Sequence, residues 1–211
     1  MPRLTSGAIV GVDFDNTLIS YDHLIKEAAL RRGLVESAAA PNKKALRDAI
    51  RLLPDGEASW QKIQAEIYGP EIGRAELIEG VEAFLGHCGA AGVTLHIISH
   101  KTEFANYDTT RTNLRQAAMA WIEGRDLFAR SGGALARDHV RFAATLEEKV
   151  ACIGALGCGY FIDDLTEVFA HPDFPSGVEK MLFDRSRAVT EPSAGAFANW
   201  PDMTEYLLGD D

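Results

Sequence analysis

Short apolar segments alternate with amphipathic segments along most of the chain. Aliphatic runs bounded by turn-forming residues predict buried β-strands at residues 8–12, 93–99, 140–142, 160–162 and 181–183. The segments between them carry apolar residues at helical spacing, as in Val81, Phe84, Leu85 and Cys88. Strands that alternate with helices predict an α/β fold built on a doubly wound parallel sheet with right-handed crossovers.

Local signals mark the ends of several helices. Gly92 follows the helical pattern that begins at Val81, and glycine is a typical stop signal. Thr145 and Glu148 have the spacing of a capping box, which predicts a helix beginning directly after residue 145. We expect the chain after Phe183 to be irregular, because it contains proline and serine and shows no sustained period.

Residues 19–79 interrupt the alternation of strands and helices. Their pattern is helical and strand-poor, with helices expected at residues 22–30, 42–52 and 60–67. We therefore predict two domains. Residues 1–18 and 80–211 form the α/β core, and residues 19–79 form a helical insertion that serves as a lid over the strand ends.

Two aspartates, Asp13 and Asp15, directly follow the first predicted strand. A buried parallel strand delivers such residues to its carboxyl end, where open α/β sheets bind their ligands. Two ionised carboxylates at this spacing repel each other unless a cation lies between them or one holds a proton. The pair therefore indicates binding of a hard metal ion, acid–base chemistry, or both.

Further polar residues lie at the ends of later strands or on the helices that follow them. Ser99 ends the second predicted strand, Lys149 lies on the helix after the third, and Asp163 and Asp164 end the fourth. Each one alone has a structural explanation, such as a helix cap or a solvated lysine. Parallel strands would bring all of them to one edge of the sheet, and this joint arrangement favours catalysis.

Composition narrows the classes of function. The chain has 211 residues, of which 25% are charged, and a formal net charge of −10. This acidity argues against nucleic acid as the main partner, because nucleic-acid binding needs a basic face. Cys88, Cys152 and Cys158 are scattered, which predicts neither a disulfide framework nor a zinc site. With no segment apolar enough to span a membrane, the expected compartment is the reducing cytoplasm.

The chain resembles the haloacid dehalogenase-like (HAD) superfamily of aspartate-nucleophile hydrolases through an ordered set of motifs: Asp13-Phe14-Asp15-Asn16-Thr17, Ser99, Lys149 and Asp163-Asp164. The resemblance spans nearly the whole chain and implies a Rossmann-like core. The helical insertion is similar to the C1 cap of the superfamily. Asn16 stands where the commonest pattern has glycine, and asparagine tolerates the same left-handed turn.

The resemblance implies a phosphatase mechanism. Asp13 would attack phosphorus and form an aspartyl-phosphate, while Asp15 would protonate the leaving oxygen and then activate water. Mg²⁺ would be bound by Asp13, the backbone carbonyl of Asp15 and Asp164, with Asp163 assisting directly or through water. The implied substrate is a small phosphorylated metabolite, and sugar phosphates and nucleotides are both candidates.

The same resemblance implies supporting roles for other residues. Ser99 would donate a hydrogen bond to the transferring phosphoryl group, and Lys149 would neutralise its charge. Thr17 would hold the loop geometry through its hydroxyl. His100 and Lys101 follow Ser99 directly and are candidates for contacting the substrate or the lid, the alternative being an exposed loop pair without such a role.

Other functions on the same fold stay open. A dehalogenase needs no general acid at position 15, because halide leaves unprotonated, so Asp15 favours phosphoester hydrolysis. Phosphotransfer is one rival; phosphonate cleavage is another, and in the related family it uses a cap lysine. The insertion contains four lysines: Lys26, Lys43, Lys44 and Lys62. A receiver-type or non-catalytic regulatory protein is the rival outside enzymes, although a binding module has no use for a leaving-group acid.

Overall fold

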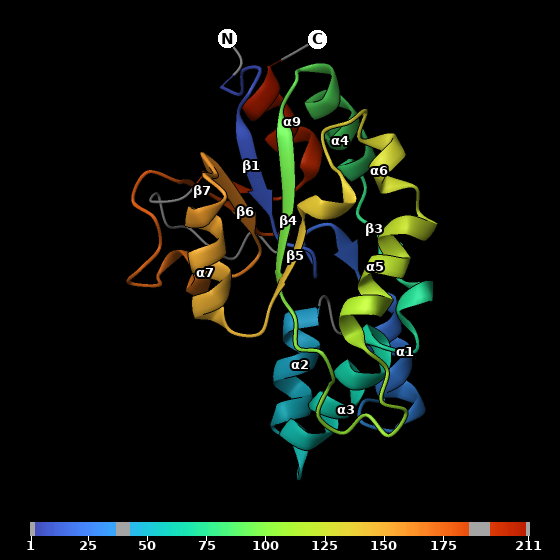
Figure 1. Ribbon diagram of the computed structural model, residues 1–211. Helices are drawn as coiled ribbons and strands as arrows, with labels where there is room; N and C mark the ends of the chain where they lie inside the picture. Colours follow the sequence, from blue (N-terminus) through green and yellow to red (C-terminus); the bar gives the residue numbers. More distant parts are fainter. Residues whose placement is uncertain (1–2, 37–42, 186–194, 210–211) are drawn as a thin grey trace. The chain divides into compact units, whose positions relative to one another are not determined.

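Six parallel strands form the main sheet of the structure (Figure 1). The computed structural model describes residues 3–36, 43–185 and 195–209. The strands lie in the order β5–β4–β1–β6–β7–β8, and every neighbouring pair is parallel. Their bounds are β1 (Ile9–Val12), β4 (Thr94–His100), β5 (Val140–Ala143), β6 (Tyr160–Asp163), β7 (Glu179–Phe183) and β8 (Gly195–Phe197). The predicted doubly wound parallel α/β sheet is therefore confirmed.

Helices cover both faces of the sheet. On one face the Trp200 ring lies 4.7 Å from Phe84 and 5.4 Å from Phe183, centroid to centroid. On the other face Phe161 packs with Val150 and other buried apolar residues. The helices that belong with this sheet are α4 (Val81–Ala90), α6 (Leu127–Arg130), η2 (Arg137–His139), α7 (Leu146–Ala155), α8 (Thr166–Phe169) and α9 (Trp200–Leu208).

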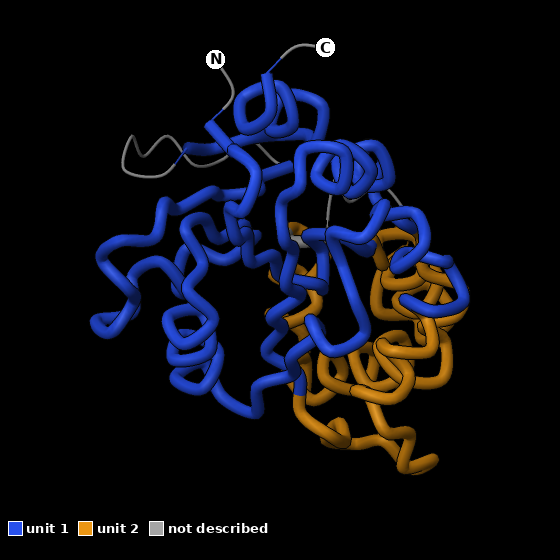
Figure 2. The backbone as a smooth tube through the Cα atoms, turned by 45° about the horizontal axis from the view of Figure 1, so that its top comes forward, with its two compact units in different colours: residues 1–19, 77–101, 122–211 blue, residues 20–76, 102–121 orange. Residues whose placement is uncertain are grey.

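The chain divides into two compact units (Figure 2). Unit 1 comprises residues 1–19, 77–101 and 122–211, and unit 2 comprises residues 20–76 and 102–121. Unit 2 is helical and contains α1 (Asp22–Arg31), α2 (Lys43–Arg51), α3 (Gly56–Tyr68), η1 (Ile72–Arg74) and most of α5 (Leu114–Gly124). A separate two-stranded sheet pairs β2 (Ile19–Ser20) with β3 (Glu76–Leu77).

Unit 2 includes a segment that the sequence analysis assigned to the α/β core. The expected insertion was residues 19–79, whereas residues 102–121 also belong to this unit. One reason is the indole N–H of Trp121, which donates a hydrogen bond to the carbonyl of Ala75 at 3.2 Å. Because these two residues are far apart in sequence, their spacing along the chain does not reveal the contact.

The structure confirms the local signals near β5 and corrects the expectation for the C-terminal segment. Thr145 Oγ1 accepts a hydrogen bond from the backbone N–H of Glu148 at 3.2 Å, and α7 begins at the next residue after Thr145. The prediction of an irregular chain after Phe183 is wrong, because β8 and α9 follow it. Asn199 caps α9 by accepting from the N–H of Asp202 at 2.9 Å. The helix start expected at residue 42 lies outside the described residues.

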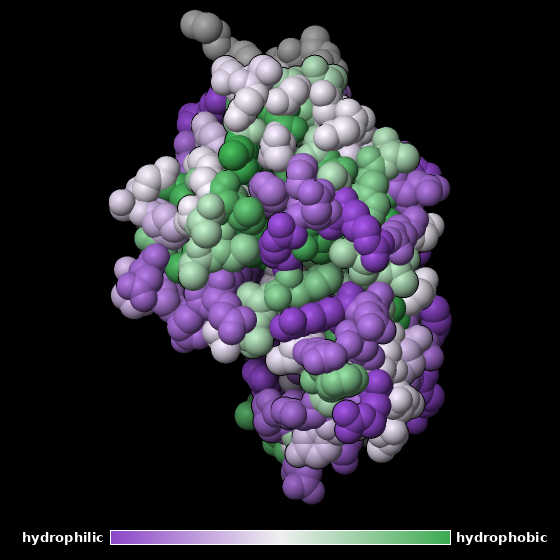
Figure 3. Space-filling view, in the orientation of Figure 1, coloured by the Kyte–Doolittle hydropathy of each residue, from purple (hydrophilic) through white to green (hydrophobic). Residues whose placement is uncertain are grey.

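Hydrophilic and hydrophobic residues are interspersed on the face shown in Figure 3. This pattern accords with a chain in which 25% of the residues are charged. Within the described residues, no helix is long and apolar enough to cross a membrane.

Candidate active site

The order of the strands creates a switch point next to β1. From β1 the chain builds outward through β4 and β5 on one side and through β6, β7 and β8 on the other. Open α/β sheets bind ligands in the crevice at such a point, beyond the carboxyl ends of the strands. Asp13 follows β1 and Asp163 ends β6, and the Asp13 N–H donates to the Ile162 carbonyl at 2.9 Å. The predicted acidic residues therefore lie where this fold binds ligands.

A tight turn follows Asp13 and shapes the site. Asn16 has a φ of 66°, in the left-handed region. This agrees with the expectation that asparagine adopts the left-handed turn at this position. The Asn16 N–H donates to the Ile19 carbonyl at 2.8 Å. Thr17 is fully buried, and its hydroxyl lies 3.4 Å from Asp13 Oδ2, at the long end of hydrogen-bonding distance. The turn thus returns the chain so that Thr17 faces the carboxylate of Asp13.

Lys149 connects two of the acidic residues. Its Nζ donates to Asp13 Oδ1 and to Asp163 Oδ2, each at 2.6 Å. All three side chains are almost completely buried. The other carboxylate oxygen of Asp163 accepts from the N–H of Leu165 at 2.9 Å. A buried lysine is stable only when paired in this way, so Lys149 is not a solvated helix residue.

Burial and charge shift the pKa values of this cluster. Burial raises the pKa of Asp13 above its ordinary value, and the attraction of Lys149 offsets this only in part. The same causes raise the pKa of Asp163 to about 7. Burial alone would lower the pKa of Lys149, but the two carboxylates outweigh it and hold that pKa above its usual range. Lys149 therefore remains an ammonium ion.

The acidic residues fit a divalent cation. Asp13, Asp163 and Asp164 each offer a carboxylate oxygen, and these atoms all lie within 4.8 Å of one another. Three carboxylates beside one ammonium leave an excess of negative charge, which a divalent cation would neutralise. Carboxylate oxygens are also the ligands that Mg²⁺ prefers. The side chain of Asp15 does not belong to this group. This agrees with the sequence-based expectation, in which Asp15 binds the metal through its backbone carbonyl.

Ser99 has an unsatisfied hydroxyl. It lies near the end of β4, is 1% exposed, and its Oγ makes no hydrogen bond within the described residues. Buried polar atoms normally find a partner, and an exception needs an explanation. A ligand oxygen bound at the site is such an explanation.

Asp15 and the residues after Ser99 form a second part of the site. Lys101 is 3% exposed, and its Nζ lies 2.7 Å from Asp15 Oδ2. His100 is exposed, and its Nε2 lies 3.1 Å from the carbonyl of Ala144. Nothing in the sequence distinguished His100 from Lys101, whereas in the structure the His100 side chain is exposed and the Lys101 side chain is buried.

Phosphonate cleavage would need a desolvated lysine in the insertion. In unit 2, Lys62 Nζ lies 5.5 Å from the centroid of the Tyr107 ring, and Lys26 is half-buried. The side chains of Lys43 and Lys44 lie outside the described residues. No observation on Lys26 or Lys62 therefore favours an imine-forming lysine.

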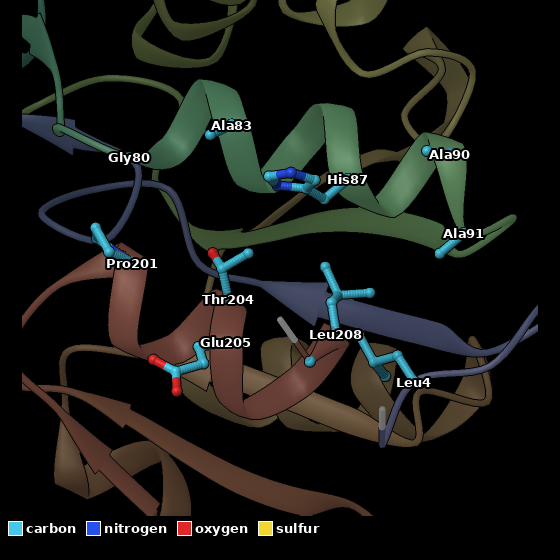
Figure 4. A pocket seen from close by; sticks show the side chains of 11 residues that line it. Leu4, Gly80, Ala83, His87, Ala90, Ala91, Pro201, Thr204, Glu205 and Leu208 are labelled. Atoms are coloured by element: carbon cyan, nitrogen blue, oxygen red, sulfur yellow. The ribbon is translucent and has the colours of Figure 1, made fainter. Parts of the chain in front are cut away.

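A separate cavity lies between α4 and α9 in unit 1 (Figure 4). Its volume is about 550 Å³, and its lining includes Ala83, His87, Thr204, Leu208 and Leu4. The predicted site residues do not line it. The acidic cluster and this cavity are therefore distinct features of unit 1.

Comparison with known proteins identifies the fold. No family model matches the sequence, and no curated protein matches it. A HAD-superfamily hydrolase from Ehrlichia chaffeensis is 15% identical, with a TM-score of 0.54 and 97% of each chain covered. A HAD family hydrolase from Deinococcus radiodurans, with bound phosphate and sodium, is 13% identical, with a TM-score of 0.52 and coverage of 94% of this chain and 93% of that one.

A third similar structure comes from Lactobacillus plantarum and is provisionally named a phosphoglycolate phosphatase. It is 16% identical, with a TM-score of 0.54 and coverage of 96% of this chain and 100% of that one. At such low identity the likeness shows the fold alone. The chain therefore has the fold of the HAD-superfamily hydrolases.

Proposed function

We propose that the protein is a Mg²⁺-dependent phosphatase that hydrolyses a small phosphomonoester through an aspartyl-phosphate on Asp13. The observation that carries this proposal is the ammonium of Lys149, which lies 2.6 Å from both Asp13 and Asp163. It holds a carboxylate at the switch point of the sheet beside a group of acidic residues suited to a divalent cation. The fold of HAD hydrolases supports the same conclusion.

In the first step a carboxylate oxygen of Asp13 attacks phosphorus, and the bond from phosphorus to the leaving oxygen breaks. The carboxyl group of Asp15 gives its proton to that oxygen, so that the product leaves as an alcohol. The buried hydroxyl of Ser99 donates to a phosphoryl oxygen, and Lys149 balances the negative charge. Thr17 supports the turn that carries both aspartates.

In the second step water attacks phosphorus of the aspartyl-phosphate. The carboxylate of Asp15 takes a proton from this water, inorganic phosphate leaves, and the carboxylate of Asp13 is restored. Asp13, Asp163 and Asp164 would hold Mg²⁺, with the carbonyl of Asp15 as a further ligand. When bound, the ion supplies positive charge that stabilises the phosphoryl oxygens.

We further assign the helical insertion, residues 19–79, the role of a C1-type cap that selects the substrate. Its presence favours a small phosphorylated metabolite over a macromolecular substrate. Asp15 distinguishes this function from dehalogenation, because a departing halide takes no proton.

The test is phosphate release from a panel of small phosphomonoesters, measured with Mg²⁺ and with a chelator. We expect turnover that requires the cation and that Asp13→Asn abolishes, while circular dichroism shows that this variant remains folded. A wild-type protein that releases no phosphate from any ester in the panel contradicts the proposal.

A single turnover in heavy-oxygen water separates the two hydrolase chemistries. If water attacks phosphorus, the label enters the released phosphate. If Asp13 forms a carboxylic ester, as in dehalogenation, water attacks the carbonyl carbon and the label enters Asp13. We expect labelled phosphate and unlabelled Asp13 in the mass spectrum of the protein.

A further inference from the structure

Each aspartate of the Asp-Phe-Asp motif is paired with its own buried ammonium. Lys149 contacts Asp13 at 2.6 Å, and Lys101 contacts Asp15 at 2.7 Å. In the first pair, the ammonium of Lys149 offsets part of the negative charge of the acidic cluster. The second pair lies on the residue to which the leaving-group proton is assigned, whereas Lys101 was expected from the sequence to contact the substrate or the lid, or to lie in an exposed loop pair.

The position of Lys101 is set by the sheet. Its backbone N–H donates to the Ala143 carbonyl at 2.8 Å, which continues the pairing of β4 with β5 by one residue. Its Nζ lies 5.8 Å from the centroid of the fully buried Phe14 ring. A lysine side chain normally samples many rotamers in solvent, but this one is enclosed and anchored at both ends.

Asp15, by contrast, follows the strand and is held by the turn. Its side chain is 17% exposed, so part of it can reach a ligand. A general acid must present its proton to the leaving oxygen in a defined direction, and small errors in direction are costly in rate. The ammonium at Oδ2 is a charge-assisted donor that fixes the plane of the carboxyl group.

We propose that Lys101 is a positioning residue that orients Asp15 for proton transfer to the leaving group, an inference that rests on the proposed phosphatase function. Lys101 itself transfers no proton in either step. Its contribution is therefore confined to reactions in which the leaving oxygen needs a proton.

This restriction yields a test that varies the leaving group. An alkyl phosphate releases a strongly basic alkoxide and needs the acid, whereas acetyl phosphate releases acetate, which leaves without a proton. In Lys101→Met we expect kcat/KM for an alkyl phosphomonoester to fall about 100-fold, within the range of general acid catalysis. We expect the fall for acetyl phosphate to be at least about 10-fold smaller.

Asp15→Asn should show the same dependence on the leaving group. The double variant Asp15→Asn/Lys101→Met should be no slower than Asp15→Asn, because residues that act as a unit are not additive. Lys101→Arg should recover part of the alkyl phosphate activity, since arginine also donates to a carboxylate. Lys101→Gln, a polar substitution, provides a second test should Lys101→Met not fold.

Lys180 offers a control lysine on β7 of the same sheet. It is half-buried on β7, with its Nζ 5.0 Å from the Phe174 ring centroid, and it donates to the Phe169 carbonyl. Lys180→Met removes a half-buried lysine of the same sheet and should leave the ratio of alkyl phosphate to acetyl phosphate activity unchanged.

The outcomes separate this inference from the proposed function. If wild-type protein hydrolyses both substrates and Lys101→Met loses them equally, chiefly through KM, then Lys101 binds the phosphoryl group and the positioning role is wrong. If wild-type protein hydrolyses neither substrate, the proposed phosphatase function itself fails. A loss confined to the alkyl phosphate supports the inference.

Discussion

At the scale of single residues, the site combines buried charges with a buried hydroxyl, that of Ser99, which lacks a hydrogen-bond partner within the described residues. Asp13, Lys149 and Asp163, by contrast, satisfy one another. A buried polar group without a partner reduces stability by about 1–3 kcal/mol. Such a cost is common where function requires a group to be ready for a ligand.

Ser99→Ala is therefore expected to separate stability from activity. Removing the unsatisfied hydroxyl should leave the free energy of unfolding unchanged or raise it by about 1 kcal/mol. The same change should reduce kcat about 100-fold, because a donor to the transferring phosphoryl group is lost. Urea unfolding and phosphate release check the two parts, and a destabilised variant with full activity would contradict both.

At the scale of single elements, the close packing of β1 against β6 depends on Gly11. A Cβ atom at this position would lie 2.6 Å from Phe161 Cδ2 and 3.0 Å from Cys158 Sγ. These distances are too short for carbon and sulfur atoms in contact, so a larger residue would force the ring to move. Glycine at this position thus serves the contact between strand and ring.

We expect Gly11→Ala to lower the free energy of unfolding by about 1–3 kcal/mol through overpacking. Gly73→Ala is the control, because a Cβ there meets no atom within 4 Å. Replacing the Phe161 ring with the smaller leucine side chain in Gly11→Ala/Phe161→Leu should recover part of the lost free energy of unfolding. Equal free energies of unfolding for Gly11→Ala and wild type in urea would contradict this prediction. They would show that Phe161 and Cys158 shift without loss of stability.

Strand β4 also buries a histidine. The ring of His96 lies 4.6 Å from that of His139, centroid to centroid, and its Nδ1 makes no hydrogen bond within the described residues. Burial lowers the pKa of His96, and the charges of His139 and Arg141 lower it further, while Asp138 opposes the shift. The neutral imidazole is therefore the form that the folded state favours.

This lowered pKa predicts how stability depends on pH. The unfolded chain binds a proton at His96 as the pH falls through about 6.5, while the folded protein does not until a lower pH. The stability from burying a neutral ring is therefore fully present above about pH 6.5 and is lost on acidification. Urea unfolding at about pH 7.5 and 5.5 should show a smaller loss in His96→Gln than in wild type. An equal loss in both proteins would contradict the assignment.

The elements show where local signals were sufficient. The five strands predicted from aliphatic runs are all present, and Thr145 caps α7 as expected. These signals are local, because burial of a parallel strand requires a continuous apolar run and a cap requires only nearby atoms. β8 has only three residues and α9 begins soon after it. The apolar periodicity of this segment was therefore too short to predict either element. The buried Trp200 at the start of α9 shows that tertiary packing stabilises this segment.

At the scale of the whole molecule, a bound cation should stabilise the folded state. Binding to the native protein alone adds about 2.7 kcal/mol when the cation is present at about 100 times its dissociation constant. The physical reason is relief of repulsion among Asp13, Asp163 and Asp164, whose oxygens lie within 4.8 Å of one another. We therefore expect Mg²⁺ to raise the Tm and a chelator to reverse the increase.

Asp164→Asn is the matching variant for this prediction. It removes one charge from the acidic group, so the increase in Tm with Mg²⁺ should shrink, and the Tm without the cation should stay unchanged or rise because less repulsion remains. A Tm of the wild-type protein that does not respond to Mg²⁺ would argue against a cation site at these residues.

The sequence by itself determined that Asp13, Ser99 and Asp163 lie at one edge of a parallel sheet and that Lys149 lies on the helix after β5. It could do so because strand ends are readable from aliphatic runs and because parallel strands all end at the same edge. The tertiary structure alone decided which ammonium meets which carboxylate. It pairs Lys149 with both Asp13 and Asp163, and Lys101 with Asp15.

The same holds for the division into units. Only the fold joins residues 102–121 to residues 20–76, and only the fold adds β8 to the sheet. The physical reason is common to all these cases. Hydrophobic periodicity indicates which face of a residue's own strand or helix is buried. Ion pairs, edge strands and unit boundaries instead depend on residues distant in the chain that folding brings into contact.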